Sequence, residues 1–484
     1  MDSFFEKDYL TRLKVLNHLI YEESSLSDIE KSLHINYKTL KNTINQLELD
    51  IKDAGLDQQI DIILSKKGKI YCKAKGVAFD RLGFYYLHHS FNYKVVEAFF
   101  FGDFNGVDNY ANQQFISHTT AFRRIVNVKQ ILEDYGLSIK LVTGEFVGEE
   151  SQKRFFFFFF YWYSYRFQHL LSSEVDWQKM ENTVTNLFTL MGTPMAYHLK
   201  RKYMLIIAIT LKRIKRKRFI NYKDGQQVYE YLMKNSPKFP GFFKIMMQLF
   251  EEFGISDSAT ISIEITALYE VLFIDQNLLP KSEMKLFKEL YPQIVEDSHH
   301  LYCVSEIQFG KDKVLKYKDE IEDGLFYSLF KSYRYYGDEE DFIPFYKKEY
   351  LRSPLYKIEE KKLRNIFEKE LPDYAARDIR SQMLKTGMMY DSLHIQIRPT
   401  LEVAVLVMSH EYVVYYIKKK VEELFRERVS ISLFLKEDTD IIISDVIDEN
   451  WDKKIPVFTF VIGNENWEEL ISIVHKTILS KSYD

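Results

Sequence analysis

The chain of 484 residues contains little cysteine, proline and glycine, and these shortages narrow the kind of protein it is. Its two cysteines, Cys72 and Cys303, lie far apart in the sequence, so they form no metal-ligand cluster. We expect them to be reduced, buried thiols of a cytoplasmic protein. With only 10 Pro and 18 Gly against 38 Phe and 34 Tyr, the chain is expected to be mainly helical. The apolar fraction of 46% argues against disorder, and the length indicates roughly three to five domains.

The chain also lacks a hydrophobic run long enough to cross a bilayer. Its most apolar stretch, residues 155–163, is too short, so we expect a buried helix there, with an interfacial membrane helix as the alternative. The first eight residues are charged and lack the apolar core of a secretion signal. The sequence therefore predicts a cytoplasmic protein with no membrane partner.

An excess of positive charge is missing as well. The formal net charge is −4, from 66 basic and 70 acidic residues, and such a balance does not indicate nucleic-acid binding. Any contact with DNA must therefore come from local basic patches. One patch is residues 212–218, for which a solvated helix end is the alternative. The other patch consists of Lys66, Lys67, Lys69, Lys73 and Lys75.

Catalytic motifs are also absent from the sequence. It contains no glycine-rich phosphate loop, no His-x-x-x-His metal pair and no nucleophile elbow. We therefore expect no enzymatic activity, and the sequence indicates no catalytic residue, no cofactor and no metal.

What the chain does contain is a repeated pattern near its N-terminus. The sequence around Asn36 corresponds to that around Ser117 at a constant offset of 117 − 36 = 81 residues. The offset carries Leu40, Ile44, Leu47 and Ile51 to Ala121, Ile125, Val128 and Leu132, and Gly55 to Gly136. In each copy a polar residue can cap a helix, apolar residues follow at i, i+4, i+7 and i+11, and a glycine ends the helix. Each copy is therefore predicted to hold the recognition helix of a helix-turn-helix unit.

The elements around each copy complete a winged helix-turn-helix. In the first copy, helices are expected at residues 9–22, at 28–33 and from Asn36, with Ser27 and Glu30 forming a capping box on the second helix. Two strands, 60–64 and 70–72, are expected to form the wing. The second copy repeats this plan, with helical residues from about 92, a helix from Ser117, and strands at 139–142 and 145–147.

The remainder of the chain divides into a helical middle and a mixed C-terminal part. Helices are predicted at residues 177–190, 197–214, 226–233, 242–253, 261–273, 281–295, 313–330 and 357–370. They suffice for two bundles with a boundary near residues 279–280. After residue 392, strands are predicted at 401–407, 431–435, 441–443 and 457–462, and helices at 411–426 and 467–479. This pattern favours a small α/β domain with a largely parallel sheet.

This domain order resembles the Mga/AtxA family of Gram-positive virulence transcription regulators, over nearly the whole chain. Its most specific parts are the domain order and the run Ser117, His118, Thr119, Thr120, Ala121, Phe122, Arg123, Arg124 and Ile125. The resemblance implies winged helix-turn-helix domains at 1–75 and 76–152, helical phosphotransferase-system regulation domains at 153–280 and 281–391, and an enzyme IIB-like α/β domain at 392–484. It also implies a transcription activator controlled by histidine phosphorylation through the sugar phosphotransferase system and by self-association.

The predicted contacts to double-stranded promoter DNA are the polar side chains outside the two buried stripes, with lysines of the first wing. On the first helix and wing they are Tyr37, Lys38, Thr39, Lys41, Asn42, Asn45, Lys66, Lys67 and Lys69. On the second helix they are His118, Thr119, Thr120, Arg123, Arg124 and Asn127. Such side chains meet phosphates and base edges in a major groove. The arginine pair favours the second helix as the principal reader. The alternative is that only one unit binds DNA and the other is structural.

A regulatory phosphohistidine needs an imidazole that a phosphocarrier protein can reach. His198 lies beside Lys200, Arg201 and Lys202, whose charges can stabilise a phosphate. It also lies near the position at which the family carries a phosphorylatable histidine in its first regulation domain. The other candidates are His299 and His300 in the second regulation domain, and His169. An ordinary surface or core histidine is the alternative for each.

The C-terminal domain is expected to lack phosphotransfer chemistry. The resemblance to enzyme IIB implies a nucleophilic cysteine in the loop after the first strand, but residues 407–411 contain none, and His410 is expected to be an ordinary helix-starting residue. The domain is expected instead to supply a homodimer surface. Two alternative functions remain: a phosphotransferase-system component or phosphorelay protein, and a helical scaffold whose winged units bind protein.

Overall fold

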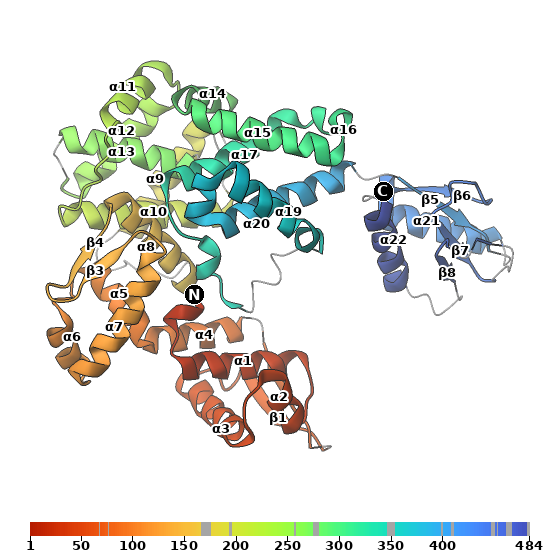
Figure 1. Ribbon diagram of the computed structural model, residues 1–484, viewed down its shortest axis with the longest axis horizontal. Helices are drawn as coiled ribbons and strands as arrows, with labels where there is room; N and C mark the ends of the chain where they lie inside the picture. The colour runs from red at the N-terminus through yellow and green to blue at the C-terminus, as the bar shows by residue number, and fades with distance from the viewer. Residues whose placement is uncertain are drawn as a thin grey trace. The chain divides into compact units, whose positions relative to one another are not determined.

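The computed structural model describes residues 1–66, 68–75, 77–165, 176–192, 196–255, 258–273, 280–345, 354–397, 400–407, 411–446, 451–452, 454–460 and 467–481. They form two compact units, drawn in Figure 1, namely Met1–Cys303 with Asp319–Gly387, and Val304–Lys318 with Met388–Asp484. The described secondary structure is mostly helical, as the shortage of glycine and proline predicts. The five-domain division is finer than these two units and stays a prediction.

The first part of the chain forms three helices and a hairpin. The elements are the short 3₁₀ helix η1 (Asp2–Phe4), α1 (Lys7–Tyr21), α2 (Leu26–Leu33), α3 (Tyr37–Asp53), β1 (Ile60–Leu64) and β2 (Ile70–Ala74). The two strands pair antiparallel, with Ile62 opposite Cys72. Helix, helix, helix and hairpin follow in the order that the sequence predicts.

The start of α2 differs from the prediction. Ser25, not Ser27, caps this helix: its hydroxyl accepts the amide of Asp28, and the Asp28 carboxylate accepts the amide of Ser25, both at 3.3 Å. Glu30 therefore takes no part in a capping box. Its carboxylate instead accepts the amide of Tyr37 at 3.1 Å, which ties α2 to the first turn of α3. Two overlapping serine motifs competed here, and the earlier one forms the reciprocal pair.

The second copy follows a connecting helix, α4 (Ala78–His89). Its elements are α5 (Phe91–Phe101), α6 (Val107–Gln113), α7 (His118–Glu133), β3 (Ser138–Lys140) and β4 (Glu145–Val147). The offset of 81 residues holds for the backbone as well. His34 and Phe115, in the turns before α3 and α7, both have φ of 53°, while Gly55 and Gly136 end these helices with φ of 65° and 62°. Because a non-glycine residue seldom adopts positive φ, the shared pair of turns shows that the repeat is structural.

A series of helices follows the second hairpin. They are α8 (Glu150–Tyr165), α9 (Trp177–Met191), α10 (Tyr197–Lys215), α11 (Gly225–Asn235), α12 (Phe239–Glu252), α13 (Ser258–Phe273), α14 (Lys281–Leu290), α15 (Pro292–Phe309), α16 (Lys311–Leu315), α17 (Lys318–Arg334), η2 (Glu339–Phe342), α19 (Pro354–Glu370) and α20 (Pro372–Ile397). The helix predicted at 281–295 is divided, because Pro292 begins a new helix, as expected of a residue without an N–H. The prediction at 313–330 is divided between α16 and α17, although no proline lies at this break, and α20 was not predicted.

The aromatic run of α8 lies in the core of the first unit. Residues 155–161 are each at most 8% exposed, which confirms the buried helix. Phe4 from the N-terminal segment lies 5.3 Å from Phe160 between ring centroids, and Phe100 from α5 lies 4.7 Å from Phe157. On its other side, the Phe155 ring stacks on Tyr335 at 4.3 Å, so the run joins the second winged unit to the segment that follows residue 334. Among the described residues, no helix is long and apolar enough to cross a membrane.

The second unit contains a parallel sheet covered by helices. Its elements are β5 (Leu401–Val405), α21 (Glu411–Phe425), η4 (Arg426–Arg428), β6 (Val429–Ser432), β7 (Ile441–Ser444), β8 (Val457–Thr459) and α22 (Trp467–Lys481). The strand order is β6-β5-β7-β8, and all three pairings are parallel, which confirms the predicted sheet. The strand predicted at 431–435 is displaced toward the N-terminus, and Leu433, Phe434 and Leu435 lie exposed beyond its end.

Candidate nucleic-acid interface

Each proposed recognition helix begins at a polar cap. The Asn36 side chain accepts the amide of Thr39 at 2.9 Å, and the Ser117 hydroxyl accepts the amide of Thr120 at 3.3 Å. The predicted stripes are buried, with Leu40, Ile44, Leu47, Ala121, Ile125 and Val128 each at most 8% exposed. Because the stripe fixes the orientation of each helix, the opposite polar face is available to a partner.

On the first winged unit (α1 to β2), the predicted contact residues face outward. The exposed side chains are Tyr37, Lys38, Thr39, Lys41, Asn42 and Asn45 on α3, and Lys66 and Lys69 on the wing. Lys67 lies outside the described residues. The face of α3 and its wing therefore carries amides, a phenol and ammonium groups, the donors that meet phosphates and base edges.

On the second winged unit (α5 to β4), the two predicted arginines differ in exposure. Arg123 is exposed, as are His118, Thr119 and Asn127, while Thr120 is partly buried and its hydroxyl accepts a hydrogen bond from Ser117 at 2.9 Å. The prediction that Arg124 also points outward holds only in part, because its side chain is 36% exposed and contacts a carboxylate. Consecutive helical residues differ by about 100° in direction, so Arg124 points to another part of the α7 surface than Arg123 does.

Arg124 points toward the N-terminal segment. Its Nη1 lies 3.1 Å from the Glu6 carboxylate, and its guanidinium lies 5.2 Å from the ring centroid of Phe91. Glu6 in turn accepts the amide of Phe91 at 3.4 Å, and its own amide donates to the Ser90 hydroxyl at 3.2 Å. Arg124 thus links the N-terminal segment to α5 and α7.

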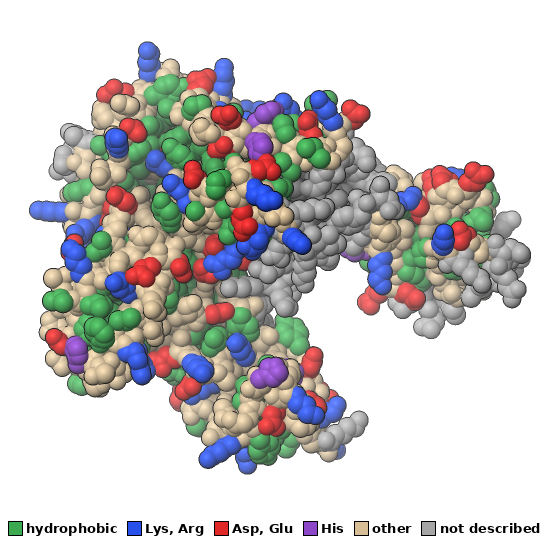
Figure 2. Space-filling view, viewed as in Figure 1, with side chains coloured by type: hydrophobic (Ala, Val, Ile, Leu, Met, Phe, Trp, Pro, Cys, Tyr) green, Lys and Arg blue, Asp and Glu red, His purple; other side chains and the backbone are tan. Residues whose placement is uncertain are grey.

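An acidic side chain beside α7 was missed from the sequence. Asp108, in the first turn of α6, lies 3.2 Å from Nε2 of His118, and both side chains are more than half exposed. This carboxylate stands next to the first turn of the proposed reading helix. On the face drawn in Figure 2, acidic and basic side chains are interspersed, consistent with the small net charge. The local arrangement, not the overall charge, therefore determines where an anion can approach.

The two winged units are joined through a buried carboxylate. Asp50, on α3, accepts Nη1 of Arg12 at 2.8 Å and the hydroxyl of Tyr86 at 2.6 Å. Burial and this hydrogen bond raise the pKa of Tyr86 above its usual value, so the phenol remains a donor. Asp50 therefore links α3 to α1 and to the connecting helix α4.

Residues 76–161 match the model of the Mga helix-turn-helix domain. Residues 76–161 are called the Mga domain below, after the model that they match. The match indicates a DNA-binding helix-turn-helix in this part of the chain. No curated protein matches the chain. The matched span runs from α4 through the capped helix α7 and its hairpin into the aromatic run of α8, so it contains the second copy of the repeat.

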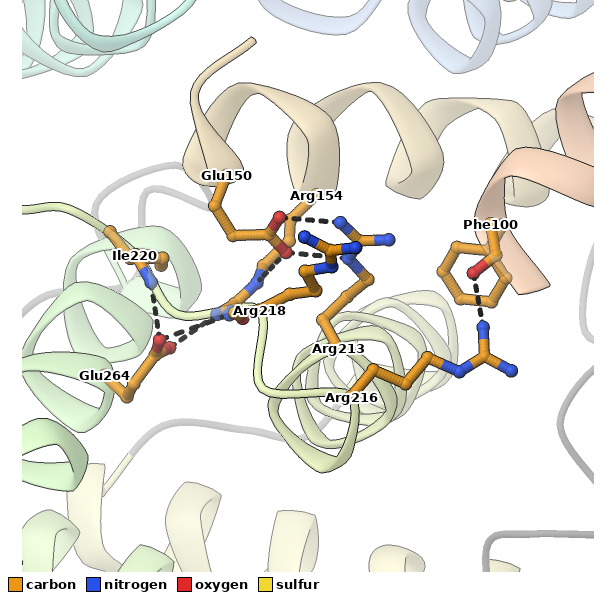
Figure 3. Close-up of polar contacts among 8 residues, drawn as sticks. All are labelled: Phe100, Glu150, Arg154, Arg213, Arg216, Arg218, Ile220 and Glu264. Carbon is orange, nitrogen blue, oxygen red and sulfur yellow. Dashed lines mark hydrogen bonds and ion pairs between the residues drawn. The ribbon is translucent and has the colours of Figure 1, made fainter. Parts of the chain in front are cut away.

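The basic run at 212–218 belongs to the attachment of the Mga domain, as Figure 3 shows. Arg213 donates through Nε and Nη2 to the Glu150 carboxylate at 2.7 and 2.6 Å, and Arg216 donates to the carbonyl of Phe100 at 2.7 Å. Lys212 and Arg213 are only 4% and 5% exposed, so neither the predicted DNA-binding patch nor its alternative, a solvated helix end, fits these two residues. A buried cation needs partners, and they come from α8 and α5 of the Mga domain.

The same network continues toward α13. Arg154 donates to Glu150 at 3.2 Å, to Glu264 at 2.5 Å and to the carbonyl of Arg218 at 2.8 Å. Glu264 also accepts the amide of Ile220 at 2.7 Å. Glu150 and Glu264 are 8% and 1% exposed, so their charges rely on these partners. The network joins α8, the helix that ends the Mga domain, to α10 and α13 (Figure 3). We call the helices that follow α8 within the first compact unit the helical body.

His198 is exposed in the first turn of α10. Of the three cations beside it in sequence, Lys200 forms an ion pair with Glu181, the Arg201 guanidinium lies 5.5 Å from the Tyr197 ring, and the Lys202 ammonium lies 5.4 Å from the Trp162 ring. A helix N-terminus itself favours an added negative charge. His198 is therefore accessible, but the cations near it have other contacts.

The remaining candidate histidines have acidic neighbours. His299 and His300, on α15, are about half exposed; Nδ1 of His299 lies 2.8 Å from Glu322, and His300 forms an ion pair with Glu370. These carboxylates would repel a phosphate on either ring. His169 and the loop with His410 lie outside the described residues.

Proposed function

We propose that this chain is a transcription regulator that binds double-stranded promoter DNA through α7 of the Mga domain and through α3. The match at residues 76–161 carries the proposal, and the second capped helix with an outward polar face supports it. On α7 the expected contacts are His118, Thr119, Arg123 and Asn127. On the first winged unit they are the exposed residues of α3 and of its wing.

Genome-wide mapping of bound DNA followed by titration of a mapped duplex against salt tests this function. Each phosphate contact should contribute about −0.9 to the slope of log affinity against log salt. Replacement of Lys38 or Lys41 should reduce the magnitude of that slope if the first winged unit binds DNA. Replacement of Arg123 should reduce it if the Mga domain binds DNA. A chain that binds no duplex in any salt, but retains protein partners, would favour the scaffold alternative.

We further propose that the chain works as a homodimer through its C-terminal unit. In that unit Tyr412 and Tyr415 on α21 are 87% and 62% exposed, and Leu433 and Phe434 after β6 are 56% and 64% exposed. Exposed aromatic and aliphatic side chains of this kind favour protein contact. Removal of residues 393–484 should leave a monomer in sedimentation, and a truncated chain that still sediments as a dimer would place the interface elsewhere.

Control by phosphocarrier proteins of the sugar phosphotransferase system, acting on an activator, completes the proposal. His198 is the preferred acceptor because it is exposed at the start of α10, whose other end enters the network around Arg213 and Glu150. His198→Ala should abolish sugar-dependent changes in target expression, and His198→Asp should partly fix one state. If both variants respond like the parent, His299 and His300 are the next residues to test.

A further inference from the structure

A cavity of about 390 Å³ lies in the helical body of the first unit, and none of the functions above uses it. Its walls come from α8, α10, α13, α17 and α20 and from residues 220–224 before α11. Cavities that hold small molecules have volumes of about 300–1,000 Å³, mostly apolar walls and a few convergent polar groups. This cavity therefore has the size and construction of a small-molecule site.

One part of the cavity is apolar. Its walls include Phe155 and Phe158 from α8, Ile206 from α10, and Leu268 and Val271 from α13. These side chains present rings and branched alkyl groups, with which the body of a ligand can pack but no ion can be solvated. The occupant must therefore have an apolar portion.

The polar part of the lining has more cationic than acidic side chains. Its charged members are Arg154, Lys223, Arg334, Arg377, Asp224 and Glu264. Among the described residues, Arg334 donates only through Nη2, to the Glu270 carboxylate at 2.7 Å. That carboxylate also accepts hydrogen bonds from the hydroxyls of Tyr222 and Tyr291. Arg377 donates through Nη1 to the main-chain carbonyls of Ser332 and Tyr333 in α17, and no ion pair with a described carboxylate is formed by it. Both guanidinium groups thus keep N–H groups for a further acceptor, beside an apolar wall.

We propose that this cavity binds a small organic carboxylate with an aromatic or branched apolar body. The carboxylate meets the guanidinium groups of Arg334 and Arg377, because the planar fork of arginine matches two carboxylate oxygens. The apolar body lies against Phe158 and Leu268. The excess of cationic over acidic side chains in the lining disfavours amines, and the loss of the charge-assisted bonds disfavours alcohols of the same shape.

The cavity shares two residues with the network that holds the Mga domain. Arg154 and Glu264 line it and are also the residues through which α8 meets α13 (Figure 3). A ligand against this pair stabilises the arrangement in which α8, and with it the Mga domain, is joined to the helical body. The regulatory consequence rests on the proposed function, whereas binding itself does not.

Isothermal titration of the full chain with 4-phenylbutyrate tests the proposal, with 4-phenylbutan-1-ol and 4-phenylbutylamine as probes of equal shape. We expect one carboxylate per chain, affinity at least tenfold lower for the alcohol, and no binding of the amine. Equal binding of all three probes, or no binding of the carboxylate to the folded chain, would overturn the proposal. No DNA is present, so the result is independent of the proposed DNA-binding function.

Variants place the site within the cavity. Val271→Trp fills the apolar part and should abolish binding, while Arg377→Met should weaken it at least tenfold. Arg364→Met, on an exposed side chain of α19 outside the cavity, should leave affinity unchanged. Circular dichroism checks folding, and Ala267→Met provides a smaller filling substitution if the tryptophan is not tolerated. A folded filling variant that binds as tightly as the parent would show that the carboxylate binds elsewhere.

Discussion

The most demanding test of the structure is the removal of the Arg213 side chain by Arg213→Met. In the folded chain its guanidinium makes two hydrogen bonds to Glu150, at 2.6 and 2.7 Å, with both side chains less than a tenth exposed. Breaking a buried ion pair by removing one partner costs about 3–5 kcal/mol. Glu150 keeps Arg154 at 3.2 Å, so we expect the lower end, about 3 kcal/mol, or about a hundredfold in the unfolding equilibrium.

Urea denaturation of the full chain measures this loss, and hydrogen exchange locates it. Exchange should rise in α8 and in the C-terminal half of α10, where the network joins the Mga domain to the helical body. Arg218→Met is the matched control, because this neighbouring arginine has an exposed side chain and contributes only its carbonyl to the network. Equal shifts of the urea midpoint for the two variants would refute the reasoning.

A double-mutant cycle distinguishes the loss of the Arg213–Glu150 ion pair from a general disruption of core packing. Glu150→Gln removes the charge that Arg213 neutralises and leaves a side chain of similar volume. If the ion pair carries the effect, the two substitutions together should cost clearly less than the sum of their separate costs. Additive losses would mean that Arg213 stabilises the fold by packing, for example through the Phe157 ring 5.9 Å away, and not through its charge.

Three further outcomes follow from particular side chains. Arg123→Ala should weaken binding to a duplex about tenfold at moderate salt without lowering the melting temperature, while Arg124→Ala should change affinity much less because its guanidinium meets Glu6; equal losses would contradict this assignment. Asp108→Asn removes a negative charge beside α7 and should strengthen binding about two- to fivefold in anisotropy at low salt, with no gain at high salt; a gain that persists at high salt would have another cause. Burial raises the pKa of Asp378 from 3.8 to about 7, so the folded chain holds this proton more tightly than the unfolded chain, and stability should fall as pH rises from about 4 to about 7. Asp378→Asn should flatten that dependence in melting curves, and an unchanged slope would show that another group causes it.

Features that depend on nearby residues could be predicted from the sequence. The recognition helices begin after Asn36 and Ser117 because a cap needs a polar side chain and an amide three residues later. Their buried stripes follow from helical periodicity, and the parallel sheet from apolar runs separated by a helix. Where two local motifs overlapped, the prediction chose the wrong one: Ser27 was expected to cap α2, but Ser25 does so through its reciprocal bonds with Asp28.

The sequence by itself therefore determined the repeat, its capped helices, the buried aromatic helix and the type of each region. Only the tertiary structure decided which polar side chains are exposed to a binding partner. Arg124 faces Glu6, 118 residues away, and Arg213 is buried against Glu150, 63 residues away, although both read as exposed cations in sequence. The cavity beside Arg334 likewise needs five helices to meet. The cost of burying a charge depends on partners brought close by folding, and no local pattern encodes them.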